Sequence, residues 1–368
     1  MGGDDWSQLR DDEGGLTAVI EFLSAFTLFL MILTAFMSLA QLEMGSNDTG
    51  IDQVDQAVVL GLDRLTSSSG WFVPSDGNGG YDHTNSTMDW HLQPASALEQ
   101  GRVHTGLVIN NQLDLERVSA LSNVTLTSFS LGLGLADDLT AHLRISVQSS
   151  DDEGRIGLEL FEGGASLNNA RMASTASSTV RMGTELVLVT LEVHDAGRAN
   201  ENLVLTEVMA RPISGGPEWI EVYNDNAFAT NLYGWSFNVS TASTSNEVLL
   251  QEGVISGHAV ALFTGSLSSL EQGNASQMFD LGQYGLLGTG SMNLLDDGAG
   301  VIELRFTRPG QTNPVTHSIA EWGGQTGLLM NLNQVLVWDA GSTISSGSWS
   351  VQQDATPGDV FFEQTNAS

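Results

Sequence analysis

The distribution of apolar residues divides the chain into an anchor, a stem and two folded regions. Positions 16–40 read LTAVIEFLSAFTLFLMILTAFMSLA, with Glu21 as the one ionisable side chain. A helix rises about 1.5 Å per residue, so this run can span the ~30 Å hydrocarbon core of a bilayer. The next residues, QLEMGSNDTG, do not match the small-residue cleavage site of a signal peptide. We therefore expect a retained transmembrane helix over 16–42, after a cytoplasmic or processed leader over 1–15.

The segment after the anchor has the period of an amphipathic helix. In IDQVDQAVVLGLDRL, four apolar residues recur at the spacing of one helical face: Val54, Val58, Leu62 and Leu65. The polar segment TSSSG ends the pattern. A stem helix over 43–69 is predicted.

Residues 70–198 mix helical and strand patterns, which predicts a small α/β head. The Gly-, Asn- and aromatic-rich stretch 70–94 is expected as a loop. In LDLERVSALSN, a short helix would direct Leu115, Val118 and Leu121 inward. Three alternating segments are expected as strands: 142–149, 155–162 and 184–194.

Residues 199–368 show short alternating segments bounded by Gly, Asn or Asp, and no convincing helical period. This spacing predicts an all-β sandwich. The alternation in EWIEVYN places two sets of side chains on opposite faces of one strand: Glu218, Ile220 and Val222 on one, and Trp219, Glu221 and Tyr223 on the other.

Charge and cysteine content narrow the classes of function. The chain has 44 acidic residues and 12 basic ones, all Arg, for a net charge of −32. Such a surface repels nucleic acid, so no nucleic-acid partner is expected. The balance is typical of salt-adapted archaeal proteins or of an acidic extracellular protein. Cysteine is absent, which excludes disulfides, zinc–thiolate sites and a thiol nucleophile.

The C-terminal region resembles the lamin-tail domain, an immunoglobulin-like β-sandwich. The matching positions follow the family's order, including E-W-I-E-x-x-N, L-x-G-W, NLLDDGAGVIEL and the closing T-P-G. They are Glu207, Glu218, Trp219, Glu221, Asn224, Gly234, Trp235, Thr356, Pro357 and Gly358. The resemblance covers about 160 residues.

These residues are expected to be structural. Trp219 and Trp235 are large apolar anchors, Gly234 allows a tight backbone, and Asn224 is expected to cap a turn. The three motif glutamates, Glu207, Glu218 and Glu221, are expected on a solvated strand face, with coordination of a cation as the alternative.

The N-terminal half resembles archaeal type IV pilin-like membrane proteins. Polar DDEGG precedes an apolar helix with Glu21 near its start. In that family a peptidase cuts after Gly, which here implies cleavage between Gly15 and Leu16. The new amine then neutralises the Glu of a neighbouring subunit. Two features depart from the family: Glu21 would be the sixth residue rather than the fifth, and acids replace the basic residues before the Gly.

Two interpretations of the carboxylate of Glu21 remain open. It lies at the membrane interface and reaches water, or it registers one subunit against the next in a homo-oligomeric or heteromeric assembly. Arg10 on the N-terminal flank favours a cytoplasmic N-terminus and an extracellular remainder. Glycosylation sequons fit that side: Asn47, Asn85, Asn123, Asn238, Asn274 and Asn366.

The sequence offers few residues that could bind a metal or catalyse a reaction. Asp76, Asn78 and Asp82 in SDGNGGYD offer oxygen ligands for calcium, although a polar turn explains the same residues. No other cofactor is expected. The chain has none of the zinc, nucleophile-elbow or phosphate-loop motifs, and Lys-dependent chemistry is excluded, so we expect no enzyme.

The sequence predicts a single-pass cell-surface protein of structural or adhesive function. It would display a pilin-like head over 70–198 and a lamin-tail domain over 199–368. The alternatives are a monomeric tethered module that binds an extracellular glycan or protein, and an accessory subunit of a secreted hydrolase.

Overall fold

The computed structural model of the protein describes residues 5–45, 49–168, 170–195, 202–213, 216–241, 245–284, 286–288, 295, 298–308, 310–324, 326–341 and 343–359. The fold is rich in β-strands, which form several sheets, and has one apolar helix near the N-terminus. The chain forms two compact units, residues 1–53 and 54–368.

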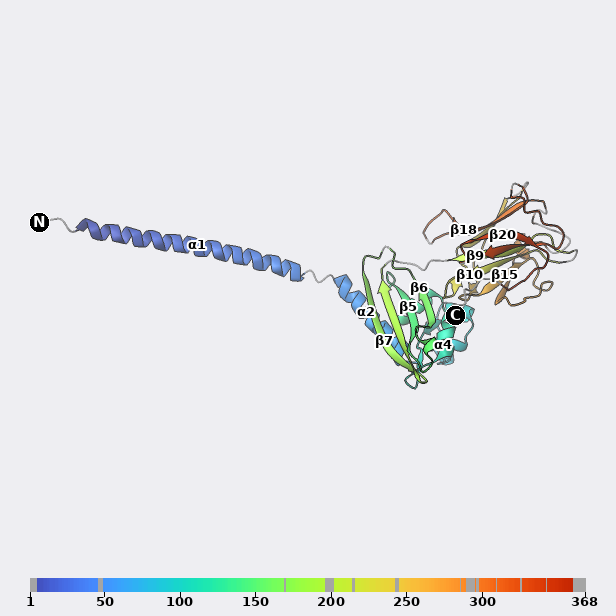
Figure 1. Cartoon of the computed structure of the whole chain (residues 1–368), viewed down its shortest axis with the longest axis horizontal. Coiled ribbons are helices and arrows are strands. Elements are labelled where there is room, and N and C mark those ends of the chain that lie inside the picture. Colours follow the sequence, from blue (N-terminus) through green and yellow to red (C-terminus); the bar gives the residue numbers. More distant parts are fainter. Residues whose placement is uncertain are drawn as a thin grey trace. The chain divides into compact units, whose positions relative to one another are not determined.

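Helix α1 (Asp5–Gly45), labelled in Figure 1, contains the apolar segment. Its stretch Thr17–Ser38 is long and apolar enough to cross a membrane, and its side chains are exposed. The hydroxyls of Ser24 and Thr34 donate to carbonyls one turn earlier, each at 2.8 Å. These polar groups are thus satisfied within the helix, as an apolar surrounding requires.

Helix α2 (Thr49–Ser67) packs on the head, and the predicted apolar face is confirmed. Val54, Val58, Leu62 and Leu65 are all buried in one hydrophobic cluster with the head sheet. At Gly61, an added Cβ would lie 2.9 Å from Leu191 Cδ2, so glycine permits the close approach of this helix to the sheet.

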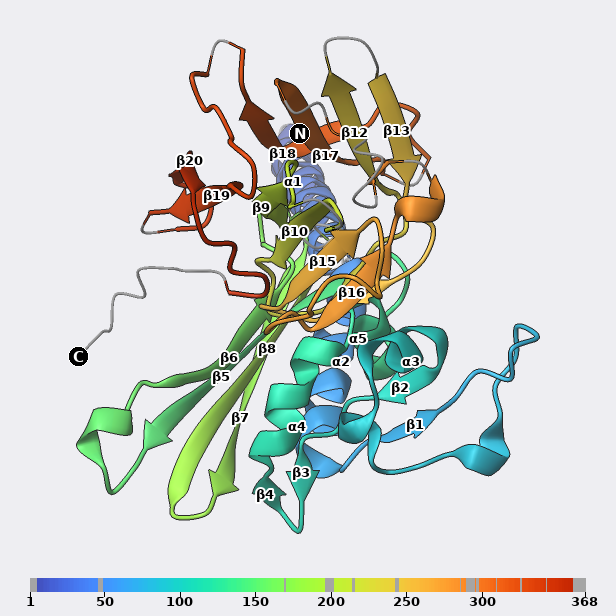
Figure 2. The ribbon, with the colours of Figure 1, turned by 90° about the vertical axis from the view of Figure 1, so that its right-hand side faces the viewer.

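The head contains a six-stranded sheet. In spatial order its strands are β3 (Val108–Ile109), β4 (Gln112–Leu113), β7 (Ala173–Met182), β8 (Glu185–His194), β5 (Thr140–Ser149) and β6 (Glu159–Gly164). The other helices are α3 (Ala95–Gln100), α4 (Leu115–Ala120) and α5 (Leu126–Leu133), with 3₁₀ turns at His83–Asn85, Trp90–Leu92, Leu121–Asn123 and Glu153–Arg155. Figure 2 shows α2, α4 and α5 beside the sheet.

Three details of the head differ from the predictions. The stretch predicted as a loop contains β1 (Trp71–Val73), which pairs with β2 (Arg102–His104) in a two-stranded ribbon. Leu115 is 47% exposed because it opens α4 directly after the capping Asp114, while Val118 and Leu121 are buried. Strand β7 was not predicted, because its residues ASTASSTV are small and mostly polar.

The C-terminal region contains two larger sheets. The six-stranded sheet has the order β16 (Gln277–Asp280), β15 (Val260–Thr264), β10 (Trp219–Asn224), β9 (Leu203–Met209), β19 (Val335–Ala340), β20 (Gly347–Gln352). The four-stranded sheet has the order β13 (Ser245–Leu249), β12 (Trp235–Thr241), β17 (Gly300–Phe306), β18 (Val315–Trp322). β11 (Thr230–Asn231) pairs with β14 (Val254–Ile255), and a 3₁₀ turn covers Gly282–Tyr284.

Both faces of the six-stranded sheet are buried along strands β9, β10 and β15. Ile220 and Val222 join the cluster shared with the four-stranded sheet, where Phe237 meets Phe263 at a ring separation of 4.9 Å. Trp219 belongs to a second cluster on the other face, with residues such as Ala275 and Ile344 from outside the sheet. Strand β10 is therefore buried along its whole length.

The head and the C-terminal region interlock through Phe228, which follows β10. Its ring lies 4.9 Å from that of Phe129 and 5.1 Å from that of Phe161, so it completes the core of the head. Backbone pairing extends the contact, because the Ala229 N–H donates to the Val124 carbonyl at 2.9 Å. The interlock joins the two regions within one compact unit.

Truncation of the interlocking ring should be costly. We expect Phe228→Ala to lower the free energy of unfolding by about 3–5 kcal/mol, because it removes a fully packed aromatic side chain. The control is Tyr233→Ala, at a tyrosine that is 67% exposed, with an effect within about 0.5 kcal/mol. Urea unfolding of both variants measures this, and equal effects would contradict the interlock.

Candidate functional site

The three motif glutamates lie inside the protein, so the expectation of a solvated strand face is wrong. Glu207 is 1% exposed, and Glu218 and Glu221 are 0% exposed. The reason is tertiary. Segments from outside the six-stranded sheet cover Glu207 and Glu221 on one face, and the segment with Gly288 and Leu295 covers Glu218. No group of three or more His, Asp or Glu side chains that could hold a metal occurs among the described residues.

Glu207 and Glu221 hold the segment that closes the sequence motif. They lie opposite each other on β9 and β10. Glu207 accepts from the backbone N–H of Thr356 at 3.3 Å and from its hydroxyl. Glu221 accepts from the backbone N–H of Gly358 at 2.6 Å and from the hydroxyl of Thr206 at 2.7 Å. The carboxyl pair thus fastens residues 356–358 to the sheet.

Burial decides the protonation of this pair. It raises the pKa of Glu207 to about 7 against the opposing effect of the Thr356 hydrogen bonds. It raises the pKa of Glu221 to about 8, with a further contribution from the charge of Glu207. A protonated carboxyl still fits each place, because a threonine hydroxyl can accept a hydrogen bond as well as donate one.

Glu218 fastens a second loop. Its carboxylate accepts from the backbone N–H of Gly288 at 2.7 Å and from that of Leu295 at 3.0 Å. These donors lie in the segment between β16 and β17, far along the chain. The glutamates of the motif are therefore buried acceptors for loop amides, a function that needs a carboxyl but no solvent.

Asn224 organises the turn that carries Phe228. Its Nδ2 donates to the carbonyls of Phe228, Ile255 and Ser256 at 3.0–3.1 Å. Its Oδ1 accepts from Asn226 and Thr230 at 3.1 Å. A single buried amide thus joins two turns, one of which enters the head.

The remaining motif residues also have structural positions. Trp219 and Trp235 are buried on strands β10 and β12. Gly234 has φ +89°, a conformation that side chains rarely adopt, and precedes Trp235 in its turn. Pro357 lies between the two residues that the carboxyl pair holds, and its carbonyl lies against Gly273.

A polar cleft of about 490 Å³ opens beside the interlock, and it is the candidate binding site. Its lining includes Glu162 and Gly163 from the head, and Asn202, Asp225 and His258 from the C-terminal region. Asn202 Nδ2 donates to Asp225 Oδ2 at 2.7 Å. These carboxylates and amides can hydrogen-bond a polar ligand.

Partial burial shifts the pKa values of two ionisable side chains in the cleft. It raises the pKa of Asp225 and lowers the pKa of His258. The Tyr223 hydroxyl lies 3.3 Å from His258 Nδ1. Burial raises the pKa of Tyr223 to about 12. His258 also has φ +52°, an uncommon conformation outside glycine. The cleft thus places neutral hydrogen-bonding groups near carboxylates.

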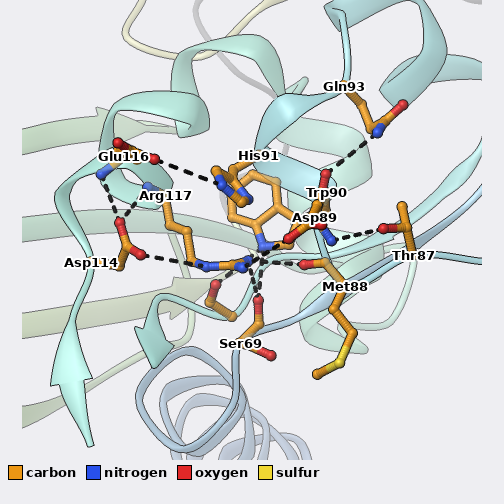
Figure 3. Close-up of polar contacts among 11 residues, drawn as sticks. Ser69, Thr87, Met88, Asp89, Trp90, His91, Gln93, Asp114, Glu116 and Arg117 are labelled. Carbon is orange, nitrogen blue, oxygen red and sulfur yellow. Dashed lines mark hydrogen bonds and ion pairs between the residues drawn. The ribbon is translucent and has the colours of Figure 1, made fainter. Parts of the chain in front are cut away.

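A buried arginine, Arg117, makes polar contacts with several segments of the head, as Figure 3 shows. The Arg117 guanidinium and the indole N–H of Trp90 both donate to the Ser69 carbonyl, the latter at 3.0 Å. Arg117 lies 3.9 Å from Asp89 and 4.0 Å from Asp114, and burial lowers its pKa. The network ties α4 to the chain that leaves α2, so its role is structural.

The predicted calcium ligands form turns with their own loop. Asp76 Oδ1 accepts from the amides of Asn78 and Gly80, each at 2.8 Å. Asp82 Oδ1 accepts from the amide of Thr84 at 3.0 Å. The amide hydrogen bonds lower the pKa of Asp76. Hydrogen bonds from the side chains of Thr84 and Asn85 chiefly lower the pKa of Asp82. The geometry favours the polar-turn interpretation of Asp76, Asn78 and Asp82.

The remaining predicted sites are spread along the chain. Gly15, Leu16 and Glu21 all lie within α1, and the side chain of Glu21 is exposed. Among the sequons, Asn85 and Asn274 are exposed, Asn123 is half-buried, and Asn238 is buried on β12. Asn47 and Asn366 lie outside the described residues.

Sequence reasoning missed Phe228 and the cleft. Phe228 stands in a polar turn, NDNAFAT, where no periodicity marks it. Its insertion depends on the distant Phe129 and Phe161. A lone aromatic between turn residues was the one available signal.

The carboxyl pair should make stability depend on pH. Both pKa values are raised from 4.5, so the folded state binds more protons than the unfolded state between pH 4.5 and about 8. The stabilisation is fully present below pH 4.5 and is lost as pH rises through 7 to 8. We expect a loss on the order of 3–5 kcal/mol per carboxyl.

The double variant Glu207→Gln, Glu221→Gln isolates this effect. Glutamine keeps one acceptor for the amide and donates to the threonine, so urea unfolding at pH 5 and pH 9 should show a smaller difference than in the wild type. Glu321→Gln, at an exposed residue of β18, should retain the wild-type difference. An unchanged difference in the double variant would contradict the assignment.

Comparisons with known proteins give no family for this chain. No family model matches it, and no curated protein matches it. One similar solved structure is a DUF4876 family protein from Bacteroides thetaiotaomicron VPI-5482, with 12% identity and a TM-score of 0.24. The alignment covers 48% of this chain and 65% of that chain, just under two thirds of its length.

Proposed function

We propose that the protein is a membrane-anchored structural or adhesion protein of the cell surface, without catalytic activity. A pilin-like head and an immunoglobulin-like lamin-tail domain would be displayed outside the cell. The observation that carries the proposal is the pairing of an exposed apolar helix, Thr17–Ser38, with a folded unit whose two regions interlock. A compact folded unit that follows a membrane helix in the chain suits display rather than chemistry.

The contacts of the motif residues support the lamin-tail assignment. Thr356 and Gly358 at the end of the motif bond to Glu207 and Glu221 near its start. Two sheets share one core in this region. The first and last parts of the matched motif therefore contact each other, as expected if they belong to one domain.

The pilin-like assignment draws on α1 and α2. Within α1, Glu21 lies near the start of the apolar stretch Thr17–Ser38, and the next helix, α2, packs on a sheet of the head. Partners would be the membrane, through residues 16–42, and neighbouring subunits, through α1. The small and hydroxylated residues of α1, such as Ser24 and Thr34, would allow close packing of such helices.

Two alternatives share the same topology. A monomeric tethered module would use the polar cleft at Asp225 and His258 to bind an extracellular glycan or protein. An accessory subunit of a secreted hydrolase would instead require a separate catalytic partner. Both lack the assembly through Glu21 that the leading proposal includes.

The N-terminus of the mature protein tests the anchor. We expect intact-mass and peptide measurements on protein from its native membrane to give a start at Leu16. A start at Met1 or Gly2 would exclude pilin-type processing and leave a simple tether. A start beyond residue 38 would identify α1 as a cleaved signal and overturn the anchor.

Replacement of Glu21 tests assembly. Glu21→Gln should reduce crosslinked oligomers in the membrane about tenfold, because the neutral side chain cannot pair with a neighbour's amine. The matched control is Gln41→Glu, which places a carboxylate at the other end of the same apolar run and should leave oligomers unchanged. Equal oligomer levels in Glu21→Gln and wild type would favour the monomeric module.

Glycan occupancy tests the orientation. If residues 54–368 face the outside, Asn85 and Asn274 should carry glycan, because both are exposed. Asn238 should not, because it is buried and donates to Glu303 at 2.7 Å. Mass spectrometry of Asn→Gln variants measures this in a host that glycosylates sequons. Absence of glycan at both exposed sites there would contradict the outward orientation.

A further inference from the structure

The β1–β2 ribbon and helix α2 carry a cluster of cationic and aromatic side chains, here named the cationic patch: Trp71, Arg102 and His104 of the ribbon, and Arg64 of the helix. The guanidinium carbon of Arg102 lies 5.8 Å from the centroid of the Trp71 ring. The His104 imidazole stacks on the same indole, with centroids 5.8 Å apart and planes inclined by 17°. Arg64 is near enough for its charge to act on His104.

Arg102 is available to an anionic ligand. It is exposed, and no carboxylate lies within ion-pair distance of it among the described residues. Other arginines of the described chain do pair with acids: Arg117, Arg144, Arg155 and Arg305. In a chain with 44 acidic residues, an unpaired exposed guanidinium keeps its full capacity to bind a carboxylate through two hydrogen bonds.

The other members of the patch have defined roles. Arg64 donates to the carbonyl of Leu133 at the end of α5, so its charge is fixed in place by a helix terminus. Burial and the Arg64 charge lower the pKa of His104, which leaves its ring a neutral, flat surface near pH 7. Trp71 is 36% exposed, so the part of its ring that Arg102 and His104 leave open can pack against the C–H groups of a sugar ring.

From this arrangement we infer that the cationic patch binds a sugar residue that carries a carboxylate, within an acidic polysaccharide. The indole would receive the ring of the sugar, and Arg102 its carboxylate. The inference deepens the proposed function and rests on it for the extracellular setting.

Two observations favour this occupant over a protein. A stable protein interface buries roughly 1,000 Å² or more, whereas the exposed part of this patch is a single indole with one guanidinium. The net charge of −32 repels a second copy of the chain, which carries the same charge, far more than a short oligouronate, whose few charges meet the local positive charge of Arg102. A single uronate unit matches both the size and the charge of the patch.

The test is a binding measurement on the full chain in detergent micelles, so it does not depend on orientation in the membrane. Isothermal titration would compare oligogalacturonate, which carries carboxylates, with neutral maltohexaose. We expect binding of oligogalacturonate alone. Arg102→Gln should weaken it about tenfold or more, since a hydrogen bond to a charged group is lost. Trp71→Phe should weaken it less, because a smaller ring remains.

Arg181→Gln is the matched control, because Arg181 is an exposed arginine of β7 with no carboxylate partner among the described residues. It should leave the affinity unchanged. Three results would overturn the inference: no binding at millimolar oligogalacturonate, equal binding of maltohexaose, or equal loss in Arg181→Gln and Arg102→Gln. Thermal unfolding of each variant verifies that the fold is retained.

Discussion

The turn around Asn224 is the constraint on which the folded unit depends. One buried amide satisfies carbonyls in two turns, and the turn that it holds inserts Phe228 into the core of the head. If that amide were lost, several buried polar groups would lack partners at once, at a cost of about 1–3 kcal/mol each. The polar network and the aromatic contact therefore stabilise the same junction, and each fixes the geometry that the other needs.

The same logic governs the buried glutamates. A strand covered on both faces has no solvent for its polar side chains, so each must find partners within the protein. Glu207, Glu218 and Glu221 find theirs in backbone amides of loops remote in sequence. The closing segment is thereby attached through hydrogen bonds rather than through a disulfide, which a chain without cysteine cannot form. The stability of this attachment therefore depends on the protonation of Glu207 and Glu221.

The scarcity of cations shapes the surface. With 12 arginines against 44 acids, most acidic side chains cannot have an arginine partner, and their like charges repel one another. Arginines that do occur in pairs stabilise particular loops, as Arg155 does with Glu185 at 2.6 Å. Against this background an exposed arginine beside a tryptophan is a distinct feature, and the polar cleft at Asp225 is a second surface of different chemistry.

The sequence by itself determined the apolar helix, the apolar face of α2, and the alternating strand β10. These follow from local periodicity, which one segment carries alone. It did not predict β7, whose small polar residues lack apolar contrast, or the exposure of Leu115 at the start of α4.

Only the tertiary structure decided the burial of Glu221 and the insertion of Phe228. Both depend on loops that pack from distant parts of the chain, and no local pattern records which face a remote loop will cover. The position of Arg102 against Trp71 was decided in the same way, by the pairing of β1 with β2 across about 30 intervening residues.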